Sequence, residues 1–354
     1  MIVICGATGQ QGGAVIDALL NVGKGPLRGL TRDIHSEKSR ALQRRGVTMV
    51  EADLANQESL VRAFQGADAV FAVTQPWRAD YKGASPRAEV VQGKAIITAA
   101  ERNQIRHLIF STVILDGKIQ KTGVPHVDSK IEIEMTLARS SVPWTILGPG
   151  TFMDNIGTKF LPVGKKSIRG FVSEDAALPY IAVHDIGRAA AKIMQSSSEH
   201  IGRRINLVAG LWNGTDVCKA LTNVYGRPYR WKAPPRILMR LFAPEFYKMR
   251  KGFEMLGRPP FPGPYLEGVE TTCKLLPDAW SIEDYVREKR PGPGARAGRI
   301  GVGRGDAIVG ATVAVDVADH RDDLAEDVAD GEAVRFGDEV LRLGAGGKHR
   351  RKYG

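Results

Sequence analysis

The chain begins with a glycine-rich turn between an apolar run and an amphipathic stretch. Residues 1–5 are apolar, and Gly6, Gly9 and Gly12 follow at a spacing of three residues. Beyond the turn, apolar side chains recur at helical spacing, at Ala14, Val15, Ala18, Leu19 and Val22. A strand, a glycine turn and a helix in this order are the context that a dinucleotide-binding fingerprint requires. This opening predicts a fold that starts with a β-α unit.

Each glycine of such a turn has its own physical role. One permits the tight turn, one lets the backbone approach a pyrophosphate, and one lets the helix lie close to the strand. The free amides and the positive dipole end at the helix start then favour anionic phosphates. The alternative is a glycine turn that serves packing alone. The predicted cofactor-binding residues of the turn are Gly6, Thr8, Gly9, Gln10, Gln11 and Gly12.

The first half of the chain alternates short apolar runs with helical patterns. Strands are expected at residues 2–5, 27–30, 48–51, 69–73, 107–111 and 145–147, and helices at 13–21, 36–45, 57–64, 89–102 and 129–140. Residues 130–135 alternate like a strand, but their Glu and Met residues favour a helix. Repeated β-α units build a parallel sheet covered by helices on both faces. The sequence therefore predicts an α/β fold, a Rossmann-type doubly wound parallel sheet with a smaller C-terminal α/β segment.

The pattern becomes less regular beyond residue 152, and the composition changes again near residue 291. Short strands are expected at 180–183 and 206–208, and helices at 186–194, with Asp185 as the N-cap, and at 215–224. Residues 291–354 hold 13 of the 40 glycines and no Ser, Asn or Gln. We predict an NAD(P)-binding domain at 1–155, a smaller substrate- or partner-binding segment at 156–289, and a disordered or non-native extension at 290–354.

Composition limits the classes of protein and partner. No apolar run reaches the ~18–20 residues of a membrane span, and no export signal is evident, so we expect a cytoplasmic protein without a membrane partner. The three cysteines are scattered, which argues against a disulfide framework or a zinc site. Positive charge is concentrated at residues 227–258. This region is either a surface for an acidic partner or the solvated face of a helix. In the helix interpretation the core side is Ile237, Leu238, Leu241 and Phe242, and nucleic acid is not the expected partner.

The residues after the second to fourth strands indicate which dinucleotide is bound. Arg32 stands about where NAD-selective sites place an acid, and a guanidinium there suits a 2′-phosphate. NADP(H) is therefore the preferred cofactor, although NAD(H) is possible if Asp33 binds the ribose instead. Asp53 and Leu54 follow the third strand, near the expected adenine. The residues after the fourth strand lie on the path toward the nicotinamide, and they are Thr74, Gln75 and Pro76.

The segment from Pro125 to Lys130 bears on whether the protein is an enzyme. Lys130 can hold the nicotinamide ribose and lower the pKa of a neighbouring acid. In a reductase that acid would be a phenol four residues earlier, but His126 occupies the position. Histidine can donate a proton near neutral pH, so Lys130 and His126 are the candidate catalytic residues. The alternative is that His126 and Asp128 cap the helix while Lys130 binds the cofactor.

Several motifs together resemble the NmrA-like proteins, which are atypical members of the short-chain dehydrogenase/reductase superfamily. These motifs are GATGQQG at residues 6–12, TRD at 31–33, TQPW at 74–77, HVDSK at 126–130, GPGTFMDN at 148–155 and YIAVHDIGRAAA at 180–191. The resemblance covers roughly residues 1–289. It implies a Rossmann domain with a smaller C-terminal segment, and it implies that Phe152 and Asn155 line the pocket floor.

The resemblance also implies two possible functions. Family members bind NADP(H) or NAD(P), and several act as redox sensors or regulators of transcription factors without the catalytic tyrosine. We therefore expect an NADP(H)-binding regulator or cofactor sensor with a regulatory protein partner. Related reductases use the same scaffold, so the alternative is an NAD(P)H-dependent oxidoreductase that reduces quinones or small conjugated carbonyls as its small-molecule substrate.

Overall fold

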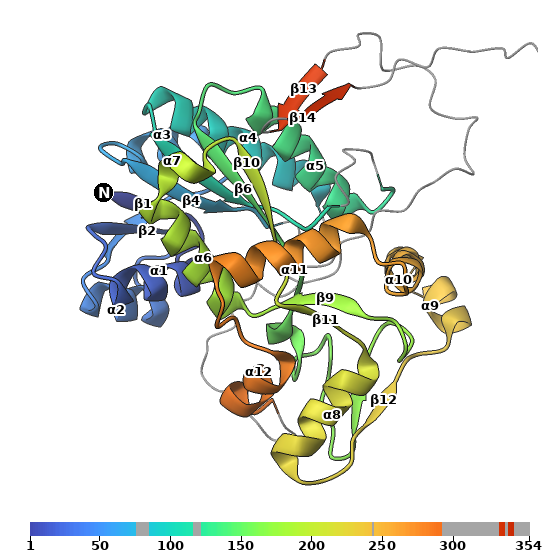
Figure 1. Ribbon diagram of the computed structural model, residues 1–354. Helices are drawn as coiled ribbons and strands as arrows, with labels where there is room; N and C mark the ends of the chain where they lie inside the picture. Colours follow the sequence, from blue (N-terminus) through green and yellow to red (C-terminus); the bar gives the residue numbers. More distant parts are fainter. Residues whose placement is uncertain (76–84, 116–121, 243, 292–332, 337–338, 343–354) are drawn as a thin grey trace, which may run out of the picture.

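The computed structural model describes residues 1–75, 85–115, 122–242, 244–291, 333–336 and 339–342 (Figure 1). Most of the predicted extension at 290–354 therefore lies outside the described residues, as does Pro76. Within that extension, β13 (Ala333–Phe336) and β14 (Glu339–Arg342) pair as antiparallel strands.

Seven parallel strands form the central sheet in the order β10-β6-β5-β4-β1-β2-β3, which confirms the predicted α/β fold (Figure 1). The order reverses direction at β1, so the loops after β1 and β4 meet at a switch point, where open α/β sheets bind ligands. The strands are β1 (Ile2–Ile4), β2 (Leu27–Thr31), β3 (Thr48–Glu51), β4 (Ala69–Val73), β5 (His107–Ser111), β6 (Trp144–Pro149) and β10 (Arg203–Leu207).

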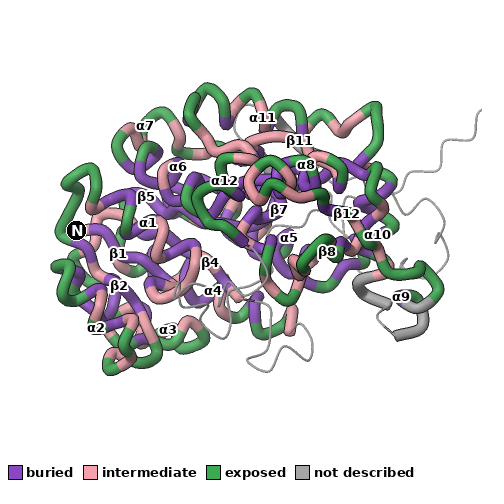
Figure 2. Tube along the Cα trace, turned by 90° about the horizontal axis from the view of Figure 1, so that it is seen from below, coloured by how far each residue is buried: buried purple, intermediate pink, exposed green. Residues whose placement is uncertain are grey.

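Helices cover both faces of this sheet, and its strands form the buried centre (Figure 2). Successive residues of β1 alternate between two cores, with Ile4 in one and Val3 in the other. One core contains α1 (Gln10–Asn21), α2 (Glu37–Arg44) and α6 (Val183–Gln195). The other contains α3 (Gln57–Ala63), α4 (Pro86–Arg102) and α5 (Pro125–Ala138), so residues 130–135 are helical as predicted. Cys5 is also buried, which raises the pKa of its thiol to about 12.

The chain beyond residue 155 builds a second, smaller part and also returns to the sheet. Strand β10 is an edge strand of the sheet and α6 packs on α1, so parts of residues 156–289 lie against the predicted NAD(P)-binding domain. The other strands form the small sheets β11-β9-β7 and β12-β8. The remaining elements are β7 (Thr151–Phe152), the 3-10 helix Met153–Asn155, β8 (Ser167–Arg169), β9 (Leu178–Ile181), α7 (Ser197–His200), β11 (Gly210–Trp212), α8 (Gly214–Tyr225), β12 (Arg230–Lys232), α9 (Arg236–Phe242), α10 (Pro244–Leu256), α11 (Gly263–Leu275) and α12 (Ile282–Lys289).

The predicted N-cap of α6 is wrong. The helix begins at Val183, and Asp185 lies buried in its first turn, where it accepts hydrogen bonds from Arg188 and from the Trp280 amide. The orphan amide of Val183 instead donates to the Asp154 carboxylate at 2.8 Å. Asp154 is 29 residues away in sequence, so this cap could not be read from the local pattern.

The basic region at residues 227–258 differs from the helix interpretation. Ile237, placed on the core side, is 68% exposed. Arg236 and the buried Arg250 both pair with Glu254, so part of the positive charge is neutralised locally. The side chains of Leu238, Leu241 and Phe242 lie outside the described part of the chain. Among the helices in the described part of the chain, none is long and apolar enough to span a bilayer.

Helices α1 and α6 approach each other closely where Gly187 of α6 faces the backbone of Ala14 in α1. A Cβ atom on Gly187 would lie 2.3 Å from the Ala14 carbonyl oxygen, a distance that real Cβ atoms do not adopt. We expect Gly187→Ala to lower the free energy of unfolding by about 1–3 kcal/mol because the helices must separate. This reverses the usual helix preference for Ala over Gly.

Gly13→Ala on the facing helix is the matched control, since its Cβ would approach nothing closer than 3.7 Å. Denaturant unfolding of both variants measures the effect. A Gly187→Ala protein as stable as Gly13→Ala would contradict the close approach.

Candidate functional site

The glycine turn after β1 is shaped by its backbone. Gly6 has a φ of +66°, which favours glycine, and the Gly9 amide donates to the Gly6 carbonyl at 2.8 Å. A Cβ on Gly12 would lie 2.2 Å from that same carbonyl oxygen, so only glycine lets α1 start this close to the turn. The amides of the first turn of α1 have no acceptor within the helix. The turn therefore forms an open cradle of N–H groups at the positive end of a helix dipole.

The two glutamines of the turn have different surroundings. Gln11 is buried, and its side-chain oxygen accepts a hydrogen bond from Ser111 at the end of β5, at 2.6 Å. This contact ties the start of α1 to the neighbouring strand end. Gln10 is only partly buried at the mouth of the turn, and Thr8 is also partly buried. Of the predicted set, Gln11 thus has a clear structural role, while Thr8 and Gln10 remain partly exposed.

Two cations stand near the end of β2. Arg32 is exposed and forms no ion pair with any described residue, so its guanidinium is available to a ligand. Asp33 is exposed and accepts the His35 amide at 2.8 Å in a local turn. Lys38, in α2, donates to the Thr8 carbonyl at 3.1 Å and so brings a second positive charge to the glycine turn. The sequence analysis missed Lys38, although a lysine in the first turn of the helix after β2 is a usable signal.

The other strand ends lie along the same edge of the sheet. After β3, Asp53 is exposed and accepts the Ala55 amide at 2.9 Å, and Leu54 is partly buried. After β4, Thr74 is buried, and the Gln75 amide donates to the Gln92 side chain at 3.2 Å. Because all seven strands are parallel, these residues share the edge that carries the glycine turn.

Lys130 lies in a buried polar cluster rather than at an open surface. Its side chain is 1% exposed, and its ammonium group donates to Glu89 at 2.5 Å and to the hydroxyl and carbonyl oxygens of Thr74 at 3.0 and 3.3 Å. Thr74 and Ser129 donate to the same carboxylate, at 2.8 and 2.5 Å. Three contacts use the three N–H bonds of Lys130. The cluster fixes the end of β4 against α4 and α5.

Glu89 was not predicted as a site residue. It lies one turn inside α4 and is fully buried, whereas a glutamate at a helix start usually reads as a solvated first-turn acid. A lysine and a glutamate on neighbouring amphipathic helices give no sequence signal of pairing. Only the packing of α4 against α5 reveals it.

The remaining predicted residues are buried around the sheet edge. His126 is 3% exposed in the first turn of α5. Asp128 accepts hydrogen bonds from Thr122 and from the Gly123 amide, so it orders the loop before α5. Phe152 is 1% and Asn155 is 9% exposed, and both flank Asp154. Burial raises the pKa of Asp154, although its hydrogen bond from Val183 acts in the opposite direction.

Removing Glu89 should strand the Lys130 ammonium in the core. We expect Glu89→Gln to cost about 3–5 kcal/mol of unfolding free energy, because a buried charge loses its counter-charge. Lys94 and Glu132 form a 2.7 Å pair on the same two helices, but their side chains are 52% and 54% exposed. Lys94→Ala should therefore cost less than about 1 kcal/mol.

Denaturant unfolding measures both variants, and adding Lys130→Met to Glu89→Gln should recover part of the loss. Equal costs for Glu89→Gln and Lys94→Ala would contradict the burial of this pair.

Comparison with known proteins places this fold and site in a family. The chain matches the model of the NmrA-like family over residues 1–275. An NAD(P)H azoreductase of Xenophilus azovorans is 30% identical over 234 residues, which cover 66% of this chain and 77% of the azoreductase. The crystal structure of NmrA, a negative transcriptional regulator in complex with NADP, is 20% identical, with a TM-score of 0.66 over 81% of this chain and 94% of NmrA. Triphenylmethane reductase of Citrobacter sp. complexed with NADP(H) is 18% identical, with a TM-score of 0.64 over 81% and 99% of the two chains. The glycine cradle, the strand-end residues and the matched length lead to one conclusion: this chain belongs to the NmrA-like family.

Proposed function

We propose that the protein binds NADP(H), with the glycine turn at the pyrophosphate and Arg32 at the 2′-phosphate. The observation that carries this proposal is the cradle itself, in which Gly6 adopts a left-handed φ and Gly12 leaves no room for a Cβ. Bare amides at a helix start suit phosphate oxygens. The NADP and NADP(H) complexes of NmrA and triphenylmethane reductase support the same assignment.

The charges after β2 favour the phosphorylated cofactor. A 2′-phosphate beside Arg32 can accept charge-assisted hydrogen bonds, each contributing roughly 1.5–3 kcal/mol. Lys38 adds a second positive charge on the glycine-turn side. Asp33 is already engaged by the His35 amide, so it competes weakly for a ribose hydroxyl. NADP(H) is therefore the preferred cofactor, with NAD(H) as a weaker ligand.

The protein groups that lie near the expected nicotinamide orient and hold the cofactor. They do not supply a proton. Lys130 has its three N–H bonds committed to Glu89 and Thr74, and His126 is buried in α5. Lys130 therefore acts by fixing Thr74 and the end of β4. This differs from the role in lowering the pKa of a phenol that the sequence suggested, because the pairing with Glu89 holds the ammonium within the core.

We propose as the main function the reduction of electron-poor acceptors, such as quinones or azo compounds. Bound NADPH supplies a hydride, which carries two electrons to the acceptor. The reduced acceptor takes its remaining proton from water, so no tyrosine is required. The 30% identical NAD(P)H azoreductase supports this choice over the regulator that the sequence analysis ranked first.

The second candidate is a regulator that changes partner binding with cofactor occupancy. Two observations favour it. The N–H bonds of Lys130 are all used within the protein, and a histidine stands at position 126, where typical reductases have the tyrosine of a Tyr–Lys pair. The two candidates share the cofactor site and differ only in turnover.

Arg32→Ala should raise the Kd for NADPH by about tenfold to a hundredfold while leaving the Kd for NADH unchanged. Isothermal titration of both nucleotides against both proteins measures this. NADH is the internal control, since it lacks the 2′-phosphate. Equal affinities of the unmodified protein for NADPH and NADH would refute the role of Arg32.

Turnover distinguishes the candidate functions. With quinone or azo acceptors, we expect NADPH oxidation that slows when deuterium occupies the transferred position and that varies little between about pH 6 and 8, because no histidine supplies the proton. NADPH binding without oxidation across an acceptor panel would remove the reductase and leave the regulator. Failure to bind any dinucleotide would remove both.

A further inference from the structure

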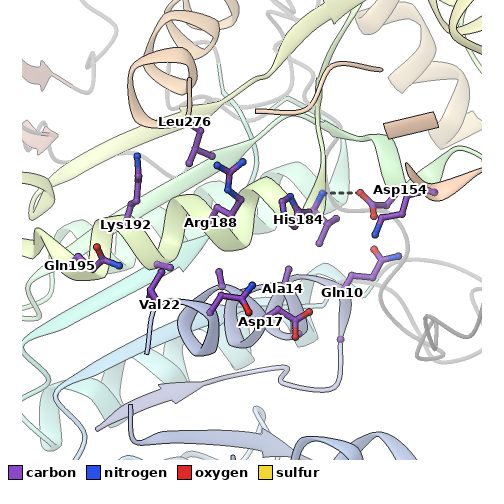
Figure 3. A pocket seen from close by; sticks show the side chains of 17 residues that line it. Gln10, Ala14, Asp17, Val22, Asp154, His184, Arg188, Lys192, Gln195 and Leu276 are labelled. Atoms are coloured by element: carbon purple, nitrogen blue, oxygen red, sulfur yellow. Dashed lines mark hydrogen bonds between the residues drawn. The ribbon is translucent and has the colours of Figure 1, made fainter. Parts of the chain in front are cut away.

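A groove runs along the seam between α1 and α6 and begins at the glycine turn. Its volume is about 590 Å³, within the range of small-molecule sites. It extends from Gly9 and Gln10 at the glycine turn to Val22 and Gln195 at the far ends of the two helices (Figure 3). We call it the α1–α6 groove.

The groove exists because the two helices touch closely at one point and carry small side chains beside it. Gly187 lets α6 approach the Ala14 carbonyl, and the flanking residues Ala14, Ala18 and Ala191 leave a trough that longer side chains would fill. Leu276 closes one wall (Figure 3). The groove therefore runs about 20 Å from Gly9 to Val22, from the 1.5 Å rise per residue of α1, and its apolar floor covers about 12 Å from Ala14 to Val22.

The charged side chains around this floor differ in whether they form ion pairs. Asp17 pairs with Arg45, and Arg188 pairs with Asp185 and Asp278. Two further cations, Lys192 and Lys289, have no carboxylate within ion-pair distance among the described residues. Lys192 donates only to the Leu275 carbonyl, at 2.8 Å, and Lys289 lies 5.3 Å from the Trp280 ring centre.

Asp154 is the acid at the glycine-turn end of the groove. It repels an anion less strongly than a fully ionised carboxylate would. Burial raises the pKa of Asp154, and Lys289 acts to lower it. The Gln10 side-chain oxygen at the same end is buried and has no hydrogen-bond partner among the described residues. Figure 3 shows Asp154 above Gln10 at this end of the groove. The groove thus combines an apolar floor with two ammonium groups, those of Lys192 and Lys289, that form no ion pair within the described residues.

We propose that the α1–α6 groove is a second binding site, for an elongated amphipathic anion of the fatty-acid class. The alkyl chain lies over Ala14, Ala18 and Ala191, and the carboxylate is held by Lys192 or Lys289. An anion gains from two ammonium groups that form no ion pair within the described residues, whereas a cation of the same length does not. The groove meets the proposed dinucleotide site at Gly9 and Gln10 and otherwise follows the outer length of α1, away from the strand ends.

Dodecanoate, below its micelle-forming concentration, is the probe. Isothermal titration into the full chain without any dinucleotide should show saturable binding, so failure here is distinct from failure to bind NADPH. Lys192→Glu with Lys289→Glu should weaken binding by about tenfold or more. Lys219→Glu is the matched control, since Lys219 is exposed on α8 and does not line the groove.

Two further arms keep the proposal falsifiable. Val22 is 52% exposed, so Val22→Glu can be made without disturbing the core, and it should weaken dodecanoate by placing a negative charge in the groove wall. Dodecyltrimethylammonium has the same chain and the opposite charge, and it should not bind.

Three outcomes would overturn the proposal. They are no saturable binding of dodecanoate, an equal loss with Lys219→Glu, or equal binding of the cationic surfactant. A dimer that dissociates on Val22→Glu, without dodecanoate binding, would assign the groove to a second copy of the chain.

Discussion

The close approach of backbone to backbone around α1 is the constraint on which the other features depend. At its start, Gly12 sits against the Gly6 carbonyl, and midway along it, Ala14 sits against Gly187 of α6. The first contact brings the helix amides to the turn, and the second brings the returning chain onto the sheet. Neither contact tolerates a Cβ, so sterics fix α1 at both places, and the hydrogen bond from Ser111 to Gln11 adds to the first. The anion cradle and the α1–α6 groove are both consequences of this placement.

Buried charge performs a different task on the opposite face. Lys130 and Glu89 join α5 to α4 and hold Thr74, while Arg204 pairs with the buried Glu134 further along α5. Such pairs contribute little net stability compared with apolar packing, but removing one partner is costly. Their effect is to fix how α5 lies against the strand ends. Lys130, a candidate catalytic residue from the sequence, thus lies in a buried ion pair.

The α/β fold was predictable because its signals are local and repeated. The glycine spacing, the alternation of apolar runs and helical patterns, and the turn after each strand all point to parallel β-α units. The helix at residues 130–135 followed from residue preference and from the β-α rhythm, which needs a helix there. Predictions that needed a partner from elsewhere in the chain were weaker. The cap of α6 comes from Asp154, and β10 returns to the sheet from beyond the expected boundary.

The sequence by itself determined the fold class, the glycine turn and the exposed arginine after β2, because each depends on neighbouring residues or on a fixed spacing. Tertiary structure alone decided that Lys130 is neutralised by Glu89, that Lys38 reaches the turn, and that a groove opens between α1 and α6. The physical reason is that burial, ion pairing and cavities arise between segments far apart in the chain. Their energies depend on distances that no local pattern encodes.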